Sequence, residues 1–361
     1  MIRLNRYALM GSPPLLDTAC YRYELPQRLI AERPSCERGD SRLLHLGPAG
    51  DEHRRFDDLT KLLRAGDLLV LNNTRVMPAR LFGRKTTGGS VEILVERVTG
   101  EPREAWVQLG ASRTPKVGTE IALGDERTEI VARDGRLFLL RSQTPWRALM
   151  SEQGTVPLPP YIRRQAGPED RERYQTVYAR TDQERSAAAP TAGLHFTEKL
   201  LQHLRTESGV RTAELTLHVG AGTFLPVKTS HPSAHHLHSE SVEIDRPLCR
   251  AVEDTRSGGG RVIAVGTTCV RALEACSLVH GGALKPWTGE TDLFIYPGSG
   301  FRFAVVDGLI SNFHLPESSL LMLVCAFAGH ERVMRAYRTA AASGYRFYSY
   351  GDATLMYRAE T

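Results

Sequence analysis

The hydrophobic pattern of the chain changes character near its middle. From Asp67 to Ser142, short apolar or alternating segments such as SVEILVERV and TEIVARDG follow one another, separated by GG, GD and DG pairs. Alternation of apolar and polar residues is typical of a strand with one buried face, and such glycine pairs mark turns. The pattern predicts a small antiparallel β unit, a barrel or a sandwich, over residues 67–142.

Beyond residue 142 the pattern is one of helices mixed with strands. In 198–207 a leucine stripe indicates a helix that Thr197 caps and Gly209 ends, and 213–219 alternate as a strand whose polar side includes His218. We predict a mixed α/β (α+β) protein in which residues 1–66 and 143–361 form a large α/β domain and 67–142 are inserted. Further elements are expected as a short helix at 144–154, a buried strand at 261–266, helices at 267–279, 317–328 and 331–343, and a closing strand and turn at 346–352.

Composition narrows the class of protein. The 361 residues are 41% hydrophobic and 24% charged, which is the profile of a globular protein with one large domain or two. The net charge of +5 is compatible with a polyanionic partner and does not demand one. The six cysteines show no metal-ligand spacing, so we expect reduced thiols and neither a zinc site nor disulfides. No apolar run is long enough to cross a bilayer, so no membrane role is expected.

Four segments combine small residues, hydroxyl groups and a histidine or arginine at the ends of expected elements. Each can also be read as an ordinary turn or helix cap. In one of them a strand leads into Gly266, and Thr267 and Thr268 follow at a helix N-terminus, where backbone amides favour anions. The chain contains neither GxGxxG nor GxxxxGK[ST], which disfavours NAD and nucleoside triphosphate enzymes. The four segments are APTAGLHFT (189–197), LHVGAGTF (217–224), AVGTTCVRALE (264–274) and SNFHLPESS (311–319).

The segment HHLHSE offers either a metal site or an acid–base pair. His236, His238 and Glu240 alternate, so an extended chain would place them on one side. A metal would need a further ligand such as His231, and the flanking HPSA and SES are typical of a solvated loop. We therefore favour acid–base chemistry over a metal.

Arginines provide weaker signals. Arg75 lies between two strand-like runs, where a buried arginine needs an anionic partner. The clusters at 54–55, 80–85 and 163–173 are each readable as solvated surface. Tyr161 and Tyr174 beside the third cluster could stack bases, which adds a little to the case for nucleic acid.

Placed in order, these segments give the chain a strong resemblance to the S-adenosylmethionine:tRNA ribosyltransferase-isomerase family of queuosine biosynthesis. The matching stretches run in the family's order from about Tyr23 to Ala353. They are YELPQRLIAERP, DSRLL, GDLLVLNNTRVMPARLFGRKTTGGSVEILVER, PLPPYIRR, ERYQTVYA, AAPTAGLHFT, LTLHVGAGTF, AVGTTCVRALE, DGLISNFHLPESSLLMLVCAFAG and YRFYSYGDA.

The resemblance implies a fold and an activity. It implies a large α/β barrel-like domain with an inserted small antiparallel β-barrel domain. The enzyme would be a cytoplasmic monomer without metal or other cofactor, and S-adenosylmethionine would be its ribosyl donor. The acceptor would be 7-aminomethyl-7-deazaguanine at the wobble position of tRNAs with a GUN anticodon, which are those for Tyr, His, Asn and Asp. The products would be epoxyqueuosine-tRNA, adenine and methionine.

Such a reaction needs a base, groups that hold the donor, and cations for phosphate. We expect the four segments to converge on one pocket. The candidates for base or acid are His195, His218, His238 and Glu240. The candidates for substrate binding are Arg75, Thr191, Gly193, Thr197, Gly220, Gly222, Thr223, Gly266, Thr267, Thr268, Arg271, Glu274, Asn312 and His314.

The chain departs from the family's usual pattern at Arg22, Arg185, Ser299 and Thr354. These departures concern the acceptor more than the donor. Two alternatives therefore stay open. One is a relative that uses the same donor on a free deazaguanine nucleoside, and the other is a non-catalytic RNA-binding protein on the same scaffold.

Overall fold

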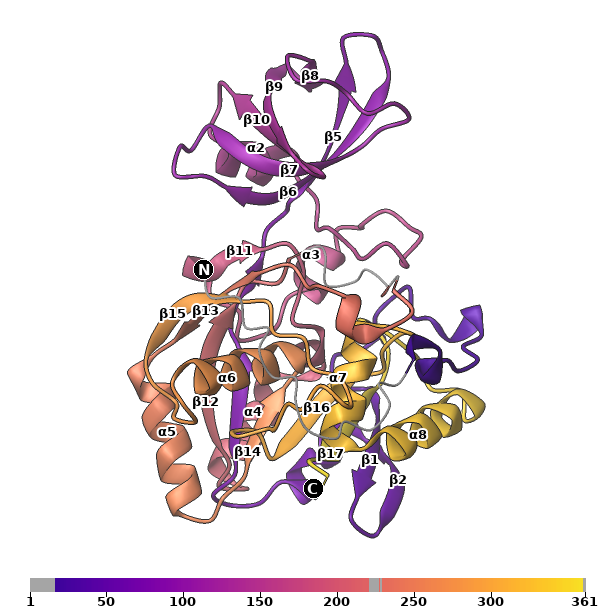
Figure 1. Cartoon of the computed structure of the whole chain (residues 1–361), viewed down its shortest axis with the longest axis vertical. Helices are drawn as coiled ribbons and strands as arrows, with labels where there is room; N and C mark the ends of the chain where they lie inside the picture. Colours follow the sequence, from indigo (N-terminus) through magenta and orange to yellow (C-terminus); the bar gives the residue numbers. More distant parts are fainter. Residues whose placement is uncertain (1–16, 221–226, 228, 360–361) are drawn as a thin grey trace. The chain divides into compact units, whose positions relative to one another are not determined.

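The computed structural model describes residues 17–220, 227 and 229–359 (Figure 1). The chain divides into two compact units. The large unit comprises Met1–Asn73, Pro190–Leu217 and Gly222–Thr361, and the small unit comprises Thr74–Ala189 and His218–Ala221.

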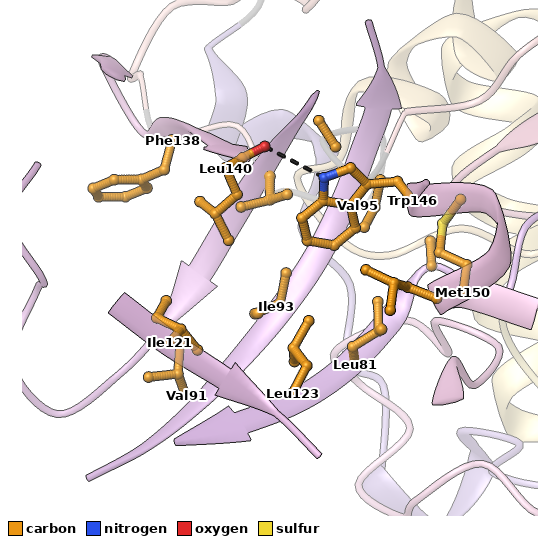
Figure 2. Close-up of a cluster of buried hydrophobic side chains, with 14 of the residues drawn as sticks. Leu81, Val91, Ile93, Val95, Ile121, Leu123, Phe138, Leu140, Trp146 and Met150 are labelled. Carbon is orange, nitrogen blue, oxygen red and sulfur yellow. Dashed lines mark hydrogen bonds between the residues drawn. The ribbon is translucent and has the colours of Figure 1, made fainter. Parts of the chain in front are cut away.

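The small unit contains a closed antiparallel barrel in the strand order β10-β7-β6-β5-β8-β9. Alternate residues of its strands point inward, as in Ser90–Val98, where Val91, Ile93 and Val95 are buried. Trp146 adds its ring to this core and donates from Nε1 to the Leu140 carbonyl at 3.3 Å (Figure 2). The strands are β5 (Arg80–Lys85), β6 (Ser90–Val98), β7 (Glu104–Gly110), β8 (Glu120–Leu123), β9 (Glu126–Asp134) and β10 (Leu137–Ser142).

The rest of the small unit consists of short elements. The expected helix at 144–154 is confirmed as α2, which carries Trp146. The elements are α2 (Trp146–Gln153), α3 (Asp170–Arg173), η4 (Thr181–Gln183) and the parallel pair β4 (Arg75–Val76) and β11 (Glu184–Ser186).

The large unit is built on a nine-stranded sheet in the order β15-β13-β12-β3-β14-β16-β17-β1-β2. Its centre, β12-β3-β14-β16, is parallel, and the flanking pairs β12-β13, β13-β15, β16-β17 and β1-β2 are antiparallel. The strands are β1 (Arg42–Gly47), β2 (Gly50–Arg55), β3 (Leu68–Asn72), β12 (Arg211–Leu217), β13 (Glu240–Ile244), β14 (Val262–Val265), β15 (Trp287–Thr291), β16 (Gly308–Asn312) and β17 (Ala353–Tyr357).

This architecture confirms the expected mixed α/β class with a small β-barrel, and it refines three details. The large domain, expected to be barrel-like, contains a sheet with β15 and β2 at its two ends. β3 is a central strand of that sheet, so residues 67–73 lie outside the small unit in which the hydrophobic pattern placed them. The expected closing strand at 346–352 is a turn, and the last strand is the buried run β17.

The helices of the large unit follow the expected stripes and caps. Thr197 Oγ1 accepts from the Leu200 amide at 3.0 Å and caps α4, as predicted. α6 packs against β14, β12 and β3 with nearly all its residues buried, and α7 lies beside α8 (Figure 1). None of the helices in the described part of the chain has the length and apolar character to span a membrane. The helices are α1 (Leu59–Leu62), α4 (Glu198–Thr206), α5 (Arg246–Ser257), α6 (Thr267–Val279), α7 (Ser319–Ala328) and α8 (His330–Ala342), with 3₁₀ turns η1 (Thr18–Tyr21), η2 (Gln27–Leu29), η3 (Phe56–Asp58), η5 (Thr191–His195) and η7 (Pro232–Ala234).

One edge of the large sheet gathers most of the chemistry-bearing segments of this unit. The parallel strands β12, β3, β14 and β16 all end at this edge, and β17 and β1 begin there. Open α/β sheets bind ligands outside the carboxyl ends of their parallel strands. This edge is therefore the place in the large unit to look for a site.

Candidate functional site

His195, at the end of η5, is buried and fully hydrogen-bonded at the carboxyl edge. Its Nδ1 lies 2.8 Å from Ser41 Oγ, and its Nε2 lies 3.0 Å from Asn312 Nδ2. The ring stacks at a tilt on Phe56, with the centroids 5.0 Å apart. Both nitrogens of His195 are thus occupied by protein groups.

The neighbours of His195 fix its tautomer. Asn312 Nδ2 also donates to the Tyr348 carbonyl at 2.9 Å, and because a carbonyl only accepts, the amino group of Asn312 must face it. The same amino group then donates to His195 Nε2, which leaves the proton of the imidazole on Nδ1, facing Ser41. Burial, and next the charge of Arg38, lower the pKa of His195 to about 3, so the ring is neutral.

Tyr348, before β17, and His314, just after β16, are two further residues at this edge. Tyr348 has a backbone φ of 73°, a conformation that non-glycine residues adopt rarely, and its carbonyl binds Asn312. His314 is buried, and its Nε2 lies 2.9 Å from Ser311 Oγ. Burial lowers the pKa of His314 to about 3, so this ring is neutral as well.

The start of α6 lies directly after β14. Gly266 has a φ of 91°, which favours glycine, and its amide donates to the Ile310 carbonyl at 2.8 Å. Thr267 and Thr268 form the first turn and are buried, and no side chain caps the helix. The expected anion-favouring helix start is thus present in the geometry.

His218 immediately follows β12 and is assigned to the small unit. Its Nδ1 lies 2.8 Å from Thr74 Oγ1, and its Nε2 is buried with no hydrogen-bond partner in the described part of the chain. Burial, and next the charge of Arg185, lower the pKa of His218 to about 4. Its ring is therefore neutral near pH 7 and keeps one nitrogen open.

The residues of HHLHSE do not share one side. Glu240 is buried and forms an ion pair with Arg271, which also donates from Nε to the Leu293 carbonyl at 3.0 Å. His236 and His238 are exposed in the loop before β13. The predicted alternation fails because β13 begins only at Glu240, whose carboxylate faces the arginine of α6. Within residues 17–220, 227 and 229–359, no group of three or more potential ligands could hold a metal ion.

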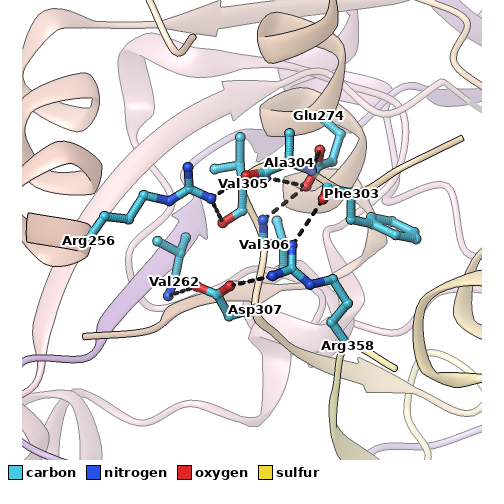
Figure 3. A network of polar contacts seen from close by, with 9 residues as sticks. All are labelled: Arg256, Val262, Glu274, Phe303, Ala304, Val305, Val306, Asp307 and Arg358. Atoms are coloured by element: carbon cyan, nitrogen blue, oxygen red, sulfur yellow. Dashed lines mark hydrogen bonds and ion pairs between the residues drawn. The ribbon is translucent and has the colours of Figure 1, made fainter. Parts of the chain in front are cut away.

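Glu274, two turns into α6, binds backbone (Figure 3). Its carboxylate accepts from the amides of Ala304, Val305 and Val306 at 2.7, 2.9 and 2.9 Å. Burial raises its pKa, while these three donors oppose that rise by stabilising the carboxylate. Glu274, one of the substrate-binding candidates, therefore anchors the chain before β16 through a structural contact that the sequence did not predict.

The other substrate-binding candidates are dispersed or serve the fold. Arg75 is a third exposed, with its Nε 3.7 Å from Glu184 Oε1. Thr191 and Gly193 lie in η5, and Thr197 caps α4. Gly220 is half-buried in the small unit, and Gly222 and Thr223 lie outside the described residues.

The basic cluster beside Tyr161 and Tyr174 is partly internal. Tyr174 is fully buried, so it cannot stack a base. Arg164 donates to Asp170 through two bonds of 2.6 and 2.8 Å. These residues pack the small unit around α3.

Sequence reasoning missed several polar groups at strand ends. The side-chain amide of Asn72 forms two hydrogen bonds with the backbone of Leu217. It donates to the carbonyl at 2.9 Å and accepts from the amide at 3.1 Å. Thr74 holds His218, and Ser41 holds His195. The sequence signal for these groups is the polar run NNT, which directly follows the apolar run LLVL.

A separate cavity of about 740 Å³ lies in the large unit, along the C-terminal half of α6 and beside β15. Its walls include the rings of Trp287, Phe294 and Tyr296 and the carboxylates of Glu290 and Asp292. None of its lining residues is among the substrate-binding candidates. Its lining residues are thus different from the buried polar groups at the carboxyl edge.

Comparison with known proteins gives a consistent family. A family model described as "Queuosine biosynthesis protein" matches residues 18–356. The S-adenosylmethionine:tRNA ribosyltransferase-isomerase of Xanthomonas euvesicatoria pv. vesicatoria (strain 85-10) is 53% identical over 352 residues, covering 94% of this chain and 97% of that protein. That of Xanthomonas oryzae pv. oryzae (strain KACC10331 / KXO85) is 52% identical over 346 residues, covering 93% and 96%.

A solved structure agrees with the sequence relatives. The crystal structure of S-adenosylmethionine tRNA ribosyltransferase from Thermotoga maritima is 36% identical to this chain, with a TM-score of 0.51. The match covers 93% of this chain and 99% of that one. Because the family model and these relatives span nearly the whole chain, the chain belongs to the queuosine biosynthesis protein family.

Proposed function

We propose that the chain is an S-adenosylmethionine:tRNA ribosyltransferase-isomerase. The observation that carries the proposal is the 53% identity to a curated relative of that name over 94% of the chain. The reaction transfers and isomerises the ribosyl group of S-adenosylmethionine onto 7-aminomethyl-7-deazaguanine at the wobble position of tRNA.

The chemistry follows from the sulfonium of the donor. The positive sulfur acidifies the ribose C5′ protons, and a base removes one of them. The electron pair of the resulting carbanion, which sulfur stabilises, forms a double bond between C5′ and C4′ as the C4′–O4′ bond breaks. O4′ then forms a carbonyl with C1′, and the bond from C1′ to adenine breaks with its electron pair leaving on adenine. The aminomethyl nitrogen then adds to C4′ and loses a proton, which regenerates the carbanion at C5′. This carbon attacks the C1′ carbonyl and closes a five-membered carbon ring, and the alkoxide so formed displaces methionine from C5′ as the epoxide closes. A positioned base contributes about 10²- to 10⁴-fold to such a step.

Among the four candidate bases, the contacts favour His218. His195 has both nitrogens bonded, His238 is exposed in its loop, and Glu240 is paired with Arg271. His218 is neutral and keeps Nε2 without a partner in the described part of the chain. We therefore propose His218 as the base that takes the C5′ proton, and His195 as a positioning residue that orients Asn312.

The finer features remain part of the proposal. The acceptors are tRNAs with a GUN anticodon, for Tyr, His, Asn and Asp, and the enzyme acts as a cytoplasmic monomer. S-adenosylmethionine is a co-substrate, and no metal or other cofactor takes part. Of the departures from the family pattern, Thr354 is buried in β17 and bonds the Ser311 carbonyl at 3.0 Å, and Arg22 pairs with Glu317 on the surface. Both side chains thus make contacts within the protein.

The test is product analysis. The protein is incubated with S-adenosylmethionine and tRNA that carries the aminomethyl base, and adenine, methionine and epoxyqueuosine-tRNA are measured together. We expect the three products in equal amounts. Turnover with a free deazaguanine nucleoside and none with tRNA would indicate the related small-molecule enzyme, and absence of adenine with both acceptors would indicate a non-catalytic RNA-binding protein.

A further inference from the structure

The first turn of α6 differs from the other helix starts of the large unit. α4, α5 and α7 each begin at a side-chain cap, supplied by Thr197, Asp245 and Ser318. α1, α6 and α8 have none, but the four-residue α1 directly continues the turn η3, and α8 begins among residues that water can reach, whereas α6 begins with buried residues. The first amides of a helix have no partner within the helix, so the start of α6 is a buried set of donors with no side-chain cap.

Two open polar atoms accompany this helix start. Thr268 in the first turn is 7% exposed, and its Oγ1 has no hydrogen-bond partner among the described residues. The neighbouring thiol of Cys269, whose pKa burial raises, is only a weak hydrogen-bonding group, so the Thr268 hydroxyl keeps its capacity for a ligand. Asn312 is 2% exposed, and its Oδ1 likewise has no partner in the described chain. Buried polar atoms left open are costly unless a ligand meets them.

The orientation of the Asn312 carbonyl is fixed. Its amino group uses both hydrogens, one on the Tyr348 carbonyl and one on His195 Nε2. His195 is held by Ser41 and is neutral, so it adds no positive charge beside the carbonyl. The chain of Ser41, His195 and Asn312 therefore presents Oδ1 as an acceptor that favours an N–H donor or a cation.

The two features belong to neighbouring strand ends. β14 pairs with β16 in parallel, with Val265 opposite Ile310, so Thr268 and Asn312 each lie two or three residues past that pair. η5 contacts both places. Ala192 Cβ lies 3.5 Å from where a Cβ on Gly266 would be, and His195, three residues on, binds Asn312.

An amide-rich helix start with a hydroxyl favours an anion, and a fixed carbonyl oxygen favours an ammonium. An α-amino acid carries both groups on one carbon. We propose that the start of α6 with Thr268 binds the α-carboxylate, and Asn312 Oδ1 the α-ammonium, of the methionine portion of S-adenosylmethionine. This inference rests on the proposed function for the identity of the ligand. It adds that the protein holds the donor by its methionine end. An RNA phosphate could accept hydrogen bonds from the start of α6 but could not donate one to Asn312 Oδ1.

The test is equilibrium binding by calorimetry with two ligands. S-adenosylmethionine has the amino-acid group, and 5′-methylthioadenosine lacks it. We expect Thr268→Val and Asn312→Leu each to weaken binding of S-adenosylmethionine about 10- to 100-fold, since each removes a hydrogen bond to a charged group, and to leave the dissociation constant of 5′-methylthioadenosine unchanged. Thr268→Ser, which keeps the hydroxyl, should bind as the unmodified protein does.

The matched control is Ser277→Ala. Ser277 lies on the same helix, is 1% exposed, and its Oγ has no hydrogen-bond partner in the described chain, but it is far from the first turn. Its substitution should leave both affinities unchanged. If Thr268→Val and Asn312→Leu weaken the binding of both ligands equally, or of neither, the assignment is wrong. If they weaken only the binding of tRNA, measured in the same way, the helix start binds phosphate instead.

These outcomes are separable from the proposed function. The unmodified protein could form epoxyqueuosine-tRNA while the Thr268 and Asn312 variants keep full affinity for S-adenosylmethionine. That result would overturn the proposed anchor and leave the proposed activity intact. If circular dichroism shows that a variant does not fold, the comparison of the two ligands on unmodified protein still tests the proposal. S-adenosylmethionine should bind more tightly than 5′-methylthioadenosine, and equal affinities would contradict the anchor.

Discussion

Two groups of polar side chains with buried polar atoms differ in how completely protein groups bond those atoms. Glu274, Arg271 and His195 have partners for their charges or ring nitrogens, and these partners are protein groups. His218 and Thr268 each keep one polar atom without a partner in the described chain. The difference teaches that a buried polar residue in a loop of this fold can be structural, and that an open atom is the better sign of a ligand.

The largest effect is expected at His218. In His218→Asn the side-chain amide can keep the contact with Thr74 Oγ1, but the atom in the place of Nε2 is lost. We expect the rate of adenine release in a single turnover to fall about 10²- to 10⁴-fold with little change in melting temperature. His53→Asn is the matched control, because His53 also has one ring nitrogen on a hydroxyl, that of Tyr345. A full rate in His218→Asn would remove His218 as the base.

The second effect tests the satisfied group. Arg271→Met removes the arginine from a buried ion pair with Glu240, and breaking a buried pair in this way costs about 3–5 kcal/mol of unfolding free energy. Urea unfolding measures it. The double variant with Glu240→Gln should recover part of the loss, because the uncompensated charge is gone. If Arg271→Met leaves the stability unchanged but weakens the binding of S-adenosylmethionine, Arg271 contacts the donor and does not act as a structural residue.

The pH dependence of stability follows from the neutral histidines. Burial lowers the pKa values of His195 and His314 to about 3 from an ordinary 6.5. Between these values the unfolded chain binds protons that the folded chain does not, so stability falls as pH falls below about 6.5. Each histidine contributes about 1.4 kcal/mol per pH unit in this window. Urea unfolding at pH 7, 6 and 5 measures the slope, and a flat profile would mean that one or both rings are charged.

The smallest effect separates a cap from a ligand contact. Thr197→Ala removes the bond to the Leu200 amide and should cost about 1 kcal/mol of stability. The rate of adenine release by the folded enzyme should be unchanged. Slower release at equal stability would return Thr197 to the donor-binding residues.

Local patterns in the sequence were sufficient for elements whose cause is local. The alternation in 90–98, the cap at Thr197 and the glycine at Gly266 each depend on residues within a few positions, and the structure confirms them. β3 was assigned to the small domain because a strand buried on both faces has no alternation, so LLVLN gives no sign of its sheet.

The contacts of the site could not be predicted in this way. His195 meets Ser41 across 154 residues and Asn312 across 117, and Arg271 meets Glu240 across 31. Nothing local in LHFT or HSE indicates whether those groups are open or already bonded. Local sequence patterns therefore name segments at this edge but cannot give the contacts of each residue.

The most direct test of the difference between open and satisfied groups is nitrogen NMR of protein with ¹⁵N-labelled histidine, with and without S-adenosylmethionine. Signals are assigned with His195→Gln and His218→Asn. We predict that His195 shows a protonated Nδ1 and an unprotonated Nε2 in both samples, while the Nε2 signal of His218 moves on binding. A His195 signal that responds to the donor, with a His218 signal that does not, would contradict the assignment of these two histidines.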